Sequence, residues 1–296
     1  MKVLVFGAGG QLGRALCEAA QRRGHTVFGL SHQATDICDA GAVRAALRQH
    51  RPTGIVNAAA YAAVEQAEEE EEVAFRVNRD GARVLAENAA EADTPLIHIS
   101  TDYVFDGKGR APYTEADPVA PEGVYARSKE EGERAVRATA PKHFILRTSW
   151  IYSPFGTNFL RTMLRLGAEK NELKIVNDQT GCPTSAADVA EASLAILAMA
   201  DPGFTSWGTY HYAGADAVTW YGFAKAIFDE AAKFGLVAPE LQPVTTADVP
   251  RPAPRPVYSV LSTAKLERVF GIKPRPLQES LAECLERLLA KREETA

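Results

Sequence analysis

Cysteine is scarce in this chain of 296 residues, and its few cysteines form no recognisable pattern. The four of them, Cys17, Cys38, Cys182 and Cys284, are far apart and include no Cys-x-x-Cys pair. Such usage is typical of free thiols in a reducing cytoplasm, and it disfavours a disulfide framework or a zinc site. We therefore expect a cytoplasmic protein and predict no metal site.

Long apolar runs and an excess of positive charge are also missing. No run approaches the roughly 18 apolar residues of a membrane-spanning helix, and the apolar part of the opening MKVLVFGAGG is too short for a signal peptide. The net charge is −5 at pH 7, which disfavours a general nucleic-acid-binding surface. Neither a membrane nor a nucleic acid is expected as a partner.

The first 150 residues alternate short apolar runs with longer amphipathic stretches. This pattern predicts strands at 2–6, 25–30, 53–58, 95–100 and 143–148, and helices at 10–23, 42–50, 64–92 and 127–139. Repeated βαβ units with right-handed crossovers give an α/β fold, a Rossmann-type doubly wound parallel sheet. We expect residues 1–150 to form a dinucleotide-binding domain of this kind.

The alternation loosens after Trp150. Helices are predicted at 158–166, 187–199, 220–234 and 277–291, and strands at 173–176 and 209–212. We expect these two strands to complete the sheet, and residues 151–296 to form mainly a smaller C-terminal substrate-binding domain. The stretch PRPAPRP at 250–256 predicts a fixed surface loop, because proline lacks the N–H that a helix interior needs. The acidic run at 68–72 is interpreted as a solvated helix face.

Gly7, Gly10 and Gly13 form a Gly-x-x-Gly-x-x-Gly turn directly after the first predicted strand. Glycine permits both a tight turn and a close approach of two backbones. The helix that follows then points its unpaired N–H groups at an anion, such as the pyrophosphate of a dinucleotide. The turn therefore predicts a dinucleotide-binding site.

The end of the second predicted strand lacks the acid that usually binds the ribose 2′-hydroxyl of NAD. No acidic residue lies between Glu18 and Asp36, and the strand end offers Ser31 and His32 instead. Nothing there repels a 2′-phosphate. We expect NADPH as coenzyme, with NADH also accepted.

Tyr125 and Lys129 form a Tyr-x-x-x-Lys pair, a spacing that places both side chains on one helix face. A lysine ammonium beside a phenol favours the phenolate and lowers its pKa from about 10. The chain has a second such pair, Tyr221 with Lys225. Only the first follows a strand ending in a hydroxyl residue, Thr101, at the sheet edge where ligands bind. Tyr125, Lys129 and Thr101 are therefore the predicted catalytic residues for proton transfer to a carbonyl.

Several longer strings are more specific than these motifs. They are NAAAY (57–61), STDYVFDG (100–107), YARSKEEGE (125–133), LRTSWIY (146–152), NDQTGCPT (177–184) and RPAPRPVYSVL (251–261). With them, nearly the whole chain resembles the dTDP-4-dehydrorhamnose reductases, a family of the extended short-chain dehydrogenase/reductase superfamily. The resemblance implies NAD(P)H-dependent reduction of the C4 ketone of dTDP-4-dehydro-6-deoxy-L-mannose to dTDP-L-rhamnose.

The resemblance also implies a cofactor-binding set. Gly10, Gln11 and Leu12 would cradle the pyrophosphate, Asp36 and Ile37 would flank the adenine, and Ala60, Tyr61 and Ala62 would line the cofactor groove. With Gly7, Gly13, Tyr125 and Lys129 these complete the predicted cofactor site.

The same resemblance implies substrate contacts and roles in the reaction. Tyr125 would protonate the substrate oxygen, Lys129 would bind the nicotinamide ribose, and Thr101 would orient the ketone. Asp102 and Tyr103 would lie beside the sugar, and Trp150 would pack on a face of the sugar.

The chain departs from the family pattern at the start of the first helix. Some members carry a magnesium ion at a dimer contact, with one glutamate just after the glycine turn. This chain has Ala15 there, and alanine at position 62 where the family often has threonine. Magnesium is therefore not expected, and a monomer or a weak homodimer is the predicted state.

Two other functions fit parts of the sequence. One is a non-catalytic NADP-binding regulatory subunit, which would not require Thr101, Tyr125 and Lys129 together. The other is a nucleotide-sugar epimerase of the same superfamily, which would show no net oxidation of its coenzyme. Coenzyme consumption with the keto-sugar nucleotide separates both from a reductase.

Overall fold

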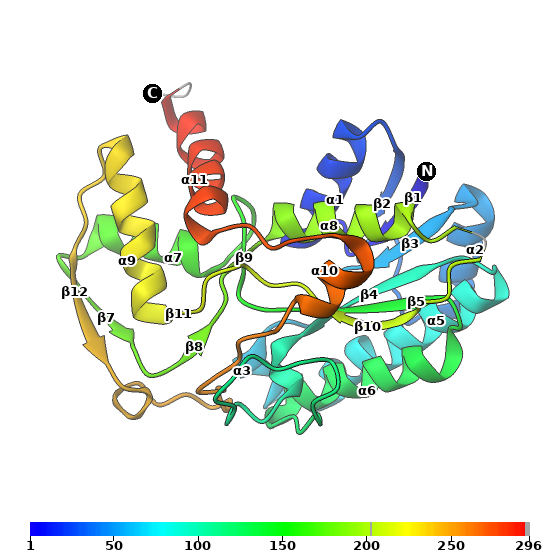
Figure 1. Ribbon diagram of the computed structural model, residues 1–296, viewed down its shortest axis with the longest axis horizontal. Helices are drawn as coiled ribbons and strands as arrows, with labels where there is room; N and C mark the ends of the chain where they lie inside the picture. Colours follow the sequence, from blue (N-terminus) through cyan, green and yellow to red (C-terminus); the bar gives the residue numbers. More distant parts are fainter. Residues whose placement is uncertain (202, 294–296) are drawn as a thin grey trace.

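The computed structural model describes residues 1–201 and 203–293, and a parallel β-sheet forms the centre of its larger half (Figure 1). In this described part the sheet has six strands in the order β10-β5-β4-β3-β1-β2, and every neighbouring pair is parallel. The strands are β1 (Lys2–Phe6), β2 (Thr26–Leu30), β3 (Gly54–Asn57), β4 (Leu96–Thr101), β5 (His143–Thr148) and β10 (Gly208–His211). The order reverses between β1 and β3, which confirms the predicted Rossmann-type doubly wound sheet.

Helices cover both faces of this sheet. On one face lie α1 (Gln11–Arg22) and α8 (Ala186–Ala198), which pack on each other in a cluster with Val5, Ile97 and Leu146. On the other face lie α2 (Ala40–His50), α5 (Ala82–Glu91) and α6 (Gly123–Thr139), around Leu4, Ile55 and Ile145. Because both faces are covered, the central strands β3 and β4 are buried along their whole length.

The predicted strand at 173–176 is not part of this sheet. It forms β7 (Glu172–Val176), which pairs in parallel with β12 (Glu240–Val244) in a separate two-stranded sheet. Only one face of β7 is buried, with Leu173 and Ile175 inward and Glu172 and Lys174 exposed. A strand inside a doubly wound sheet has both faces buried, so the one-sided burial of β7 is not that of a strand inside the central sheet. The strand predicted at 209–212 does complete the sheet, as β10.

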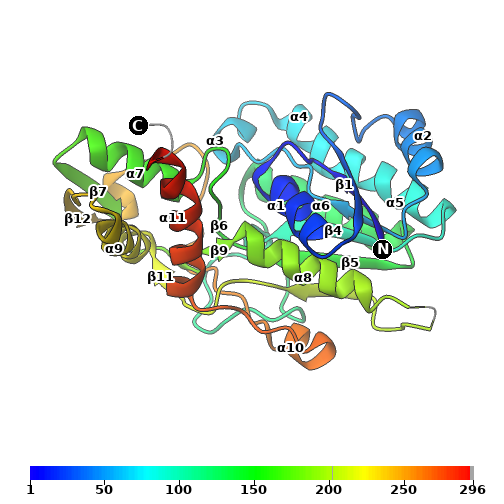
Figure 2. The ribbon, with the colours of Figure 1, turned by 90° about the horizontal axis from the view of Figure 1, so that it is seen from above.

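The smaller half contains α7 (Phe159–Glu169), α9 (Trp220–Ala231) and α11 (Leu277–Glu293) beside β7 and β12 (Figure 2). Its own core includes Tyr152, Phe223 and Leu285. Four further short strand pieces of the described residues form two pairs: β6 (Ile151–Tyr152) with β9 (Thr184–Ser185), and β8 (Thr180–Gly181) with β11 (Val218–Thr219). Since α8 and β10 follow residue 150 but pack in the sheet half, the chain passes between the halves more than once.

The single long helix predicted at 64–92 is broken in the structure. It consists of α3 (Val64–Ala67), α4 (Glu71–Phe75), a π-helical turn η1 (Arg76–Gly81) and α5. At the bends, side chains of the segment contact groups outside it: Glu68 binds Val124 N, Glu70 binds the Tyr61 hydroxyl, and Asn78 binds Ser128 Oγ. Helical periodicity alone does not predict such contacts. The structure also contains α10 (Ala264–Phe270), which the sequence did not suggest.

Short 3₁₀ turns complete the described elements: η2 (Asp102–Val104), η3 (Ala232–Phe234) and η4 (Thr246–Asp248). Within residues 1–201 and 203–293, every helix is too short or too polar to cross a lipid bilayer.

Candidate active site

The glycine turn follows β1 and lies against the end of β3. Gly7 has φ +80°, and a Cβ on it would lie 2.5 Å from the backbone nitrogen of Ala59. A Cβ on Gly13 would lie 2.1 Å from the Gly7 carbonyl oxygen. Gly10 is the N-cap residue of α1 and provides no side-chain cap. The first N–H groups of α1 therefore lack intrahelical partners and are suited to an anion.

The side chain of Gln11 is occupied by the smaller half of the molecule. Its Oε1 accepts hydrogen bonds from Ser153 Oγ at 2.9 Å and from Asn158 Nδ2 at 2.8 Å, and its Nε2 donates to Thr157 O at 3.3 Å. Gln11 can therefore meet a pyrophosphate only through its backbone, and its amide joins the glycine turn to the loop before α7.

The predicted adenine-binding residues lie between β2 and α2. Asp36 Oδ1 accepts from Cys38 N at 2.9 Å, and Asp36 Oδ2 pairs with Arg76 Nη2 at 2.6 Å. The Cys38 N–H, with smaller help from Arg76, holds the pKa of Asp36 below its usual range. The side chain of Ile37 is buried in the α2–α5 core, so only its backbone remains for a ligand.

The predicted groove residues follow β3. Ala60 and Ala62 are exposed and Tyr61 is half-buried. The Tyr61 hydroxyl donates to Glu70 Oε2 at 2.8 Å, which turns the phenol toward α4. Asn57 Oδ1 accepts from Ala59 N at 3.1 Å and fixes the start of this segment.

The end of β4 places the predicted Thr101, Asp102 and Tyr103 together. Thr101 Oγ1 accepts from Tyr103 N at 3.2 Å and so caps η2, and its hydroxyl donates to Asp102 Oδ1 at 3.2 Å. Asp102 is 2% exposed, and burial raises its pKa to about 7 even though the hydroxyls of Ser259 and Thr101 lower it in part. Asp102 therefore titrates near neutral pH beside Thr101.

Tyr125, in the first turn of α6, faces this group. Its ring meets that of Tyr103 edge-on with centroids 5.8 Å apart. Burial raises the pKa of Tyr125 well above its usual value; its interaction with the Thr101 hydroxyl lowers the pKa in part, and Asp102 and Tyr103 add to the rise. The sequence predicted the opposite direction. Burial disfavours the charged phenolate and so raises the pKa of the hydroxyl. The Lys129 ammonium, which was expected to lower this pKa, donates to the Ile99 carbonyl oxygen instead.

Lys129 lies one turn further along α6 and is 2% exposed. Its Nζ donates to Ile99 O on β4 at 2.6 Å. Burial lowers the pKa of Lys129 to about 8, and the nearby Glu133 carboxylate raises it in part. The ammonium is thus held by the strand backbone beneath the Tyr125–Thr101 pair.

A buried ion cluster lies below Lys129. Glu133 Oε2 pairs with Arg147 Nη2 at 2.7 Å, and Glu133 Oε1 accepts from Ser100 Oγ at 2.6 Å. The two charged side chains are 0% and 4% exposed. Burial alone would raise the pKa of Glu133, but the Arg147, Ser100 and Arg137 hydrogen bonds outweigh it and hold the pKa at about 2. The cluster fixes α6 against β4 and β5.

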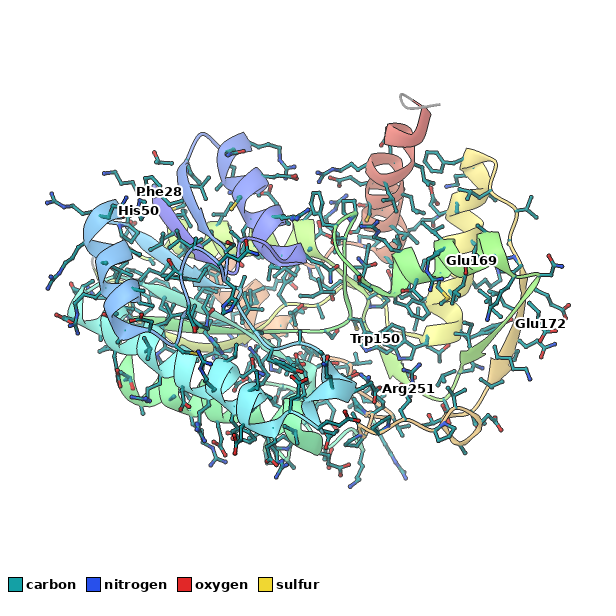
Figure 3. The ribbon with its side chains drawn as sticks, turned by 180° about the vertical axis from the view of Figure 1, so that it is seen from behind. Phe28, His50, Trp150, Glu169, Glu172 and Arg251 are labelled. Carbon is teal, nitrogen blue, oxygen red and sulfur yellow. The ribbon has the colours of Figure 1, made fainter. Side chains whose placement is uncertain are left out.

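Trp150 lies two residues beyond β5, where the two halves of the molecule meet (Figure 3). It has φ +44°, an uncommon conformation for a bulky residue that is often found at functional sites. One face of its ring stacks on Trp220, with centroids 3.5 Å apart and planes at 6°. A Cβ on Gly181 would lie 2.5 to 2.7 Å from three adjoining indole atoms, so the Gly181 backbone lies close against the same ring. One face of the indole is therefore occupied by Trp220.

The proline-rich loop at 250–256 packs across the same region. Arg255 Nη1 donates to the Tyr103 hydroxyl at 2.9 Å, and Arg255 also pairs with Glu65 of α3. Glu65 Oε2 accepts from Ala253 N at 3.0 Å. Arg251 is half exposed, with its Nη1 3.6 Å from Glu65 Oε1 (Figure 3). The loop is therefore tied to the cofactor side of the molecule, and of its two arginines Arg251 has the freer charge.

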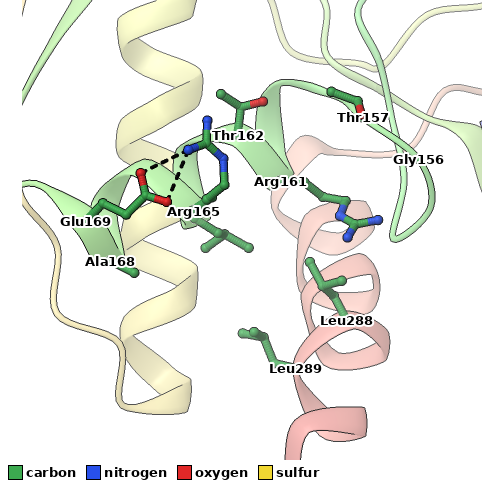
Figure 4. Close-up of a pocket in the computed structure, with 10 residues that line it drawn as sticks. Gly156, Thr157, Arg161, Thr162, Arg165, Ala168, Glu169, Leu288 and Leu289 are labelled. Atoms are coloured by element: carbon green, nitrogen blue, oxygen red, sulfur yellow. Dashed lines mark hydrogen bonds and ion pairs between the residues drawn. The ribbon is translucent and has the colours of Figure 1, made fainter.

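A cavity of about 430 Å³ lies apart from these residues, between α7 and α11 (Figure 4). Its lining includes Arg161, Leu164 and Leu288, and Arg165, which is paired with Glu169 at 2.9 Å. It belongs to the smaller half and includes none of the predicted site residues among the residues that the structure describes. Within the same residues, no group of three or more His, Cys, Asp or Glu side chains is arranged to hold a metal ion.

The sequence missed several side chains that build this site. Glu68 Oε1 accepts from Val124 N at 2.8 Å and so caps α6, the helix of Tyr125. Glu70 binds the Tyr61 hydroxyl, so the acidic run is not simply a solvated face. Asn78 contacts both the groove segment and α6. The residues to which these side chains bind lie 9 to 56 positions away in the chain, and periodicity gave no signal for them.

Comparison with known proteins identifies the family. A sequence model described as the RmlD substrate binding domain matches residues 1–290. A dTDP-4-dehydrorhamnose reductase from Aggregatibacter actinomycetemcomitans is 42% identical over 284 residues, which are 95% of this chain and 97% of that protein.

Two solved structures are similar over nearly their whole length. A dTDP-4-dehydrorhamnose reductase from Clostridium acetobutylicum superimposes with a TM-score of 0.91 at 38% identity, over 97% of this chain and 99% of that one. One from Bacillus anthracis, in complex with NADP, gives 0.89 at 34% identity over the same shares. This chain belongs to the dTDP-4-dehydrorhamnose reductase family.

Proposed function

We propose that this protein reduces the C4 ketone of dTDP-4-dehydro-6-deoxy-L-mannose to dTDP-L-rhamnose, using NADPH and also accepting NADH. The observation that carries the proposal is the placement of Tyr125 against Tyr103, the residue capped by Thr101 at the carboxyl end of β4, with Lys129 buried one turn further along α6. Family membership and the NADP complex of the Bacillus anthracis relative support the same reaction.

The residues present fit a dinucleotide. A Cβ at Gly7 or Gly13 would fill the space of the turn, and the start of α1 is uncapped. Gln11 and Leu12 would hold the pyrophosphate through backbone N–H groups, and Gly10, whose own N–H donates to Gly7 O at 3.0 Å, would shape the turn around it. Asp36 and the Ile37 backbone would flank the adenine, and the segment from Ala60 to Ala62 would line the groove. The bound coenzyme supplies a hydride to the carbonyl carbon of the substrate.

The chain supplies the proton. The raised pKa of Tyr125 keeps its hydroxyl protonated at neutral pH, which is the state that a proton donor needs. Thr101 and Tyr125 would both donate hydrogen bonds to the substrate oxygen, and Tyr125 would pass its proton to that oxygen as negative charge develops. Lys129 would bind the nicotinamide ribose with a proton not donated to Ile99 O. When the Lys129 ammonium faces the Tyr125 hydroxyl, its positive charge would stabilise the phenolate that forms as the proton leaves.

The sugar would lie between the two halves of the molecule. Asp102 and Tyr103 would line its position from the end of β4, and Trp150 would meet it with the part of its indole that Trp220 does not cover. Arg251, with its half-exposed guanidinium, is the loop cation suited to the diphosphate. We propose a monomer or a weak homodimer, because Ala15 is buried in the core where magnesium-linked members carry a glutamate.

The test is coenzyme oxidation, followed at 340 nm, with the keto-sugar nucleotide and either coenzyme, and identification of the product by NMR. The proposal expects one coenzyme oxidised for each dTDP-L-rhamnose formed. Isomerised sugar without net coenzyme oxidation would indicate an epimerase. Coenzyme binding without turnover would indicate a regulatory subunit, and either outcome would overturn the proposal.

A further inference from the structure

Asn78 connects the cofactor groove to the catalytic helix. It lies in the π-helical turn η1 and is 2% exposed. Its Oδ1 accepts from Tyr61 N at 2.8 Å, and its Nδ2 donates to Tyr61 O at 3.1 Å and to Ser128 Oγ at 2.9 Å. Only the amide oxygen can accept from the Tyr61 N–H, so this contact fixes which way the amide points.

The second link runs through Ser128 to the backbone of Tyr125. Ser128 is 0% exposed, and its Oγ donates to Tyr125 O at 2.8 Å. Its hydroxyl therefore accepts from Asn78 and donates within α6. A continuous hydrogen-bonded chain runs from the Tyr61 backbone through Asn78 and Ser128 to the residue that would donate the proton.

Two further contacts join the same elements. Glu68 caps α6 at Val124, and the Asn78 carbonyl lies 2.2 Å from where a Cβ on Gly132 would be. The segment from Tyr61 to Gly81 thus meets α6 at Val124, Ser128 and Gly132, residues spaced by four along one helix face. π-turns are frequent at functional sites, and this one turns Asn78 toward both partners.

We propose that Asn78 is a positioning residue that couples cofactor binding in the groove to the placement of Tyr125, an inference that rests on the proposed function. The groove segment from Ala60 to Ala62 belongs to no helix or strand, and the Asn78 amide holds the backbone of its middle residue from both sides. A coenzyme that orders this segment would also order α6 through Ser128.

Asn88 provides a matched control. It is also a buried asparagine, 4% exposed, and it lies ten positions further along the same helical stretch. Its Nδ2 bonds only within the helix, to Val84 O at 2.8 Å. A general loss of stability on removing a buried amide would affect both asparagines, whereas the coupling requires Asn78 alone.

The experiment measures the coenzyme Kd by fluorescence titration and kcat by coenzyme oxidation for three variants. Asn78→Ala should raise the Kd about tenfold and lower kcat about tenfold, because it removes two hydrogen bonds to the groove and one to Ser128. Ser128→Ala should lower kcat by about three- to tenfold and leave the Kd within about twofold, because the groove contacts remain. Asn88→Ala should leave both values within about twofold once the folded fraction is accounted for.

The double variant Asn78→Ala/Ser128→Ala should lose no more kcat than Asn78→Ala alone, since both changes interrupt one chain. Equal Kd and kcat for Asn78→Ala and Asn88→Ala would overturn the inference. If Asn78→Ala does not fold, Ser128→Ala tests the inference by itself. A lower kcat with an unchanged coenzyme Kd would support the coupling, and an unchanged kcat would overturn it. A wild-type enzyme that binds coenzyme and does not reduce the keto-sugar contradicts the proposed function instead, and the Kd comparison of Asn78 with Asn88 still tests the groove contact.

Discussion

The chain contains the same Tyr-x-x-x-Lys spacing on two helices, and the two copies have different surroundings. Lys129 of α6 is 2% exposed and donates to a strand carbonyl, whereas the Lys225 side chain of α9 is 61% exposed and pairs with Asp229 at 2.6 Å. Tyr125 meets Thr101 and Tyr103 at the end of β4, whereas Tyr221 packs against the core of the smaller half. Spacing places two side chains on one helix face, and of the two copies only the α6 copy lies beside a strand end of the central sheet.

Removing the two hydroxyls in turn should give the largest difference between the copies. Tyr125→Phe should lower kcat by roughly 10²- to 10⁴-fold, the usual contribution of a positioned acid, with the coenzyme Kd nearly unchanged. Tyr221→Phe should leave kcat within about twofold. Steady-state kinetics with a parallel coenzyme titration measures both, and equal losses in the two variants would remove the distinction between the copies.

The ion pairs made by acidic residues of the two helices should contribute differently to stability. Glu133→Gln leaves the buried Arg147 charge without its partner, and we expect a loss of about 3–5 kcal/mol in the free energy of unfolding. Asp229→Asn breaks a pair exposed to solvent, and we expect no measurable change. Urea unfolding of both variants tests this, and the idea fails if Glu133→Gln unfolds at the wild-type midpoint.

The two lysines should differ in coenzyme binding. Lys129→Ala should raise the coenzyme Kd by roughly 10- to 100-fold, because a charged hydrogen bond to the ribose is lost, and Lys225→Ala should not change it. Since the pKa of Lys129 is about 8, its ammonium loses its proton as the pH rises through 8, and coenzyme affinity should fall there. Lys129→Arg should move that fall to higher pH. Titrations from pH 6 to 10 measure it, and an affinity independent of pH would count against the assignment.

Coenzyme choice should give the smallest effect. His32 is exposed beyond β2, and the stretch between Glu18 and Asp36 has no acid to repel a 2′-phosphate. An exposed contact of this kind gives about a two- to fivefold preference for NADPH, and His32→Asp should reverse the order. The same change at Lys225 should leave the order unaltered. The kcat/KM values for both coenzymes decide it, and a wild-type preference for NADH of more than about tenfold would contradict the prediction.

The sequence predicted the parts of the fold whose signal is local. The strands from β1 to β5 each contain a short apolar run, and the glycine turn carries its own steric requirement, so both were found. The partner of β7 lies 68 residues away at β12, and the pieces from α3 to α5 are held by side chains of other elements, so periodicity could not place them.

The candidate site divides in the same way. Motif and strand end singled out Tyr125, Lys129 and Thr101 as candidates, and their catalytic roles stay predictions. The raised pKa of Tyr125, the Trp150–Trp220 stack and the bridging role of Asn78 depend on tertiary contacts that no spacing encodes.

The central claim is that the α6 copy of the motif carries out a ketone reduction, and transfer of deuterium from coenzyme to sugar tests it most directly. Wild-type protein would be mixed with NADPH deuterated at the transferring position of the nicotinamide and with the keto-sugar nucleotide, and the product examined by NMR. We predict one deuterium at C4 of dTDP-L-rhamnose, formed at the wild-type rate by Tyr221→Phe and at least about 100-fold more slowly by Tyr125→Phe. A product without deuterium at C4, or equally fast labelling in the two variants, would contradict the account.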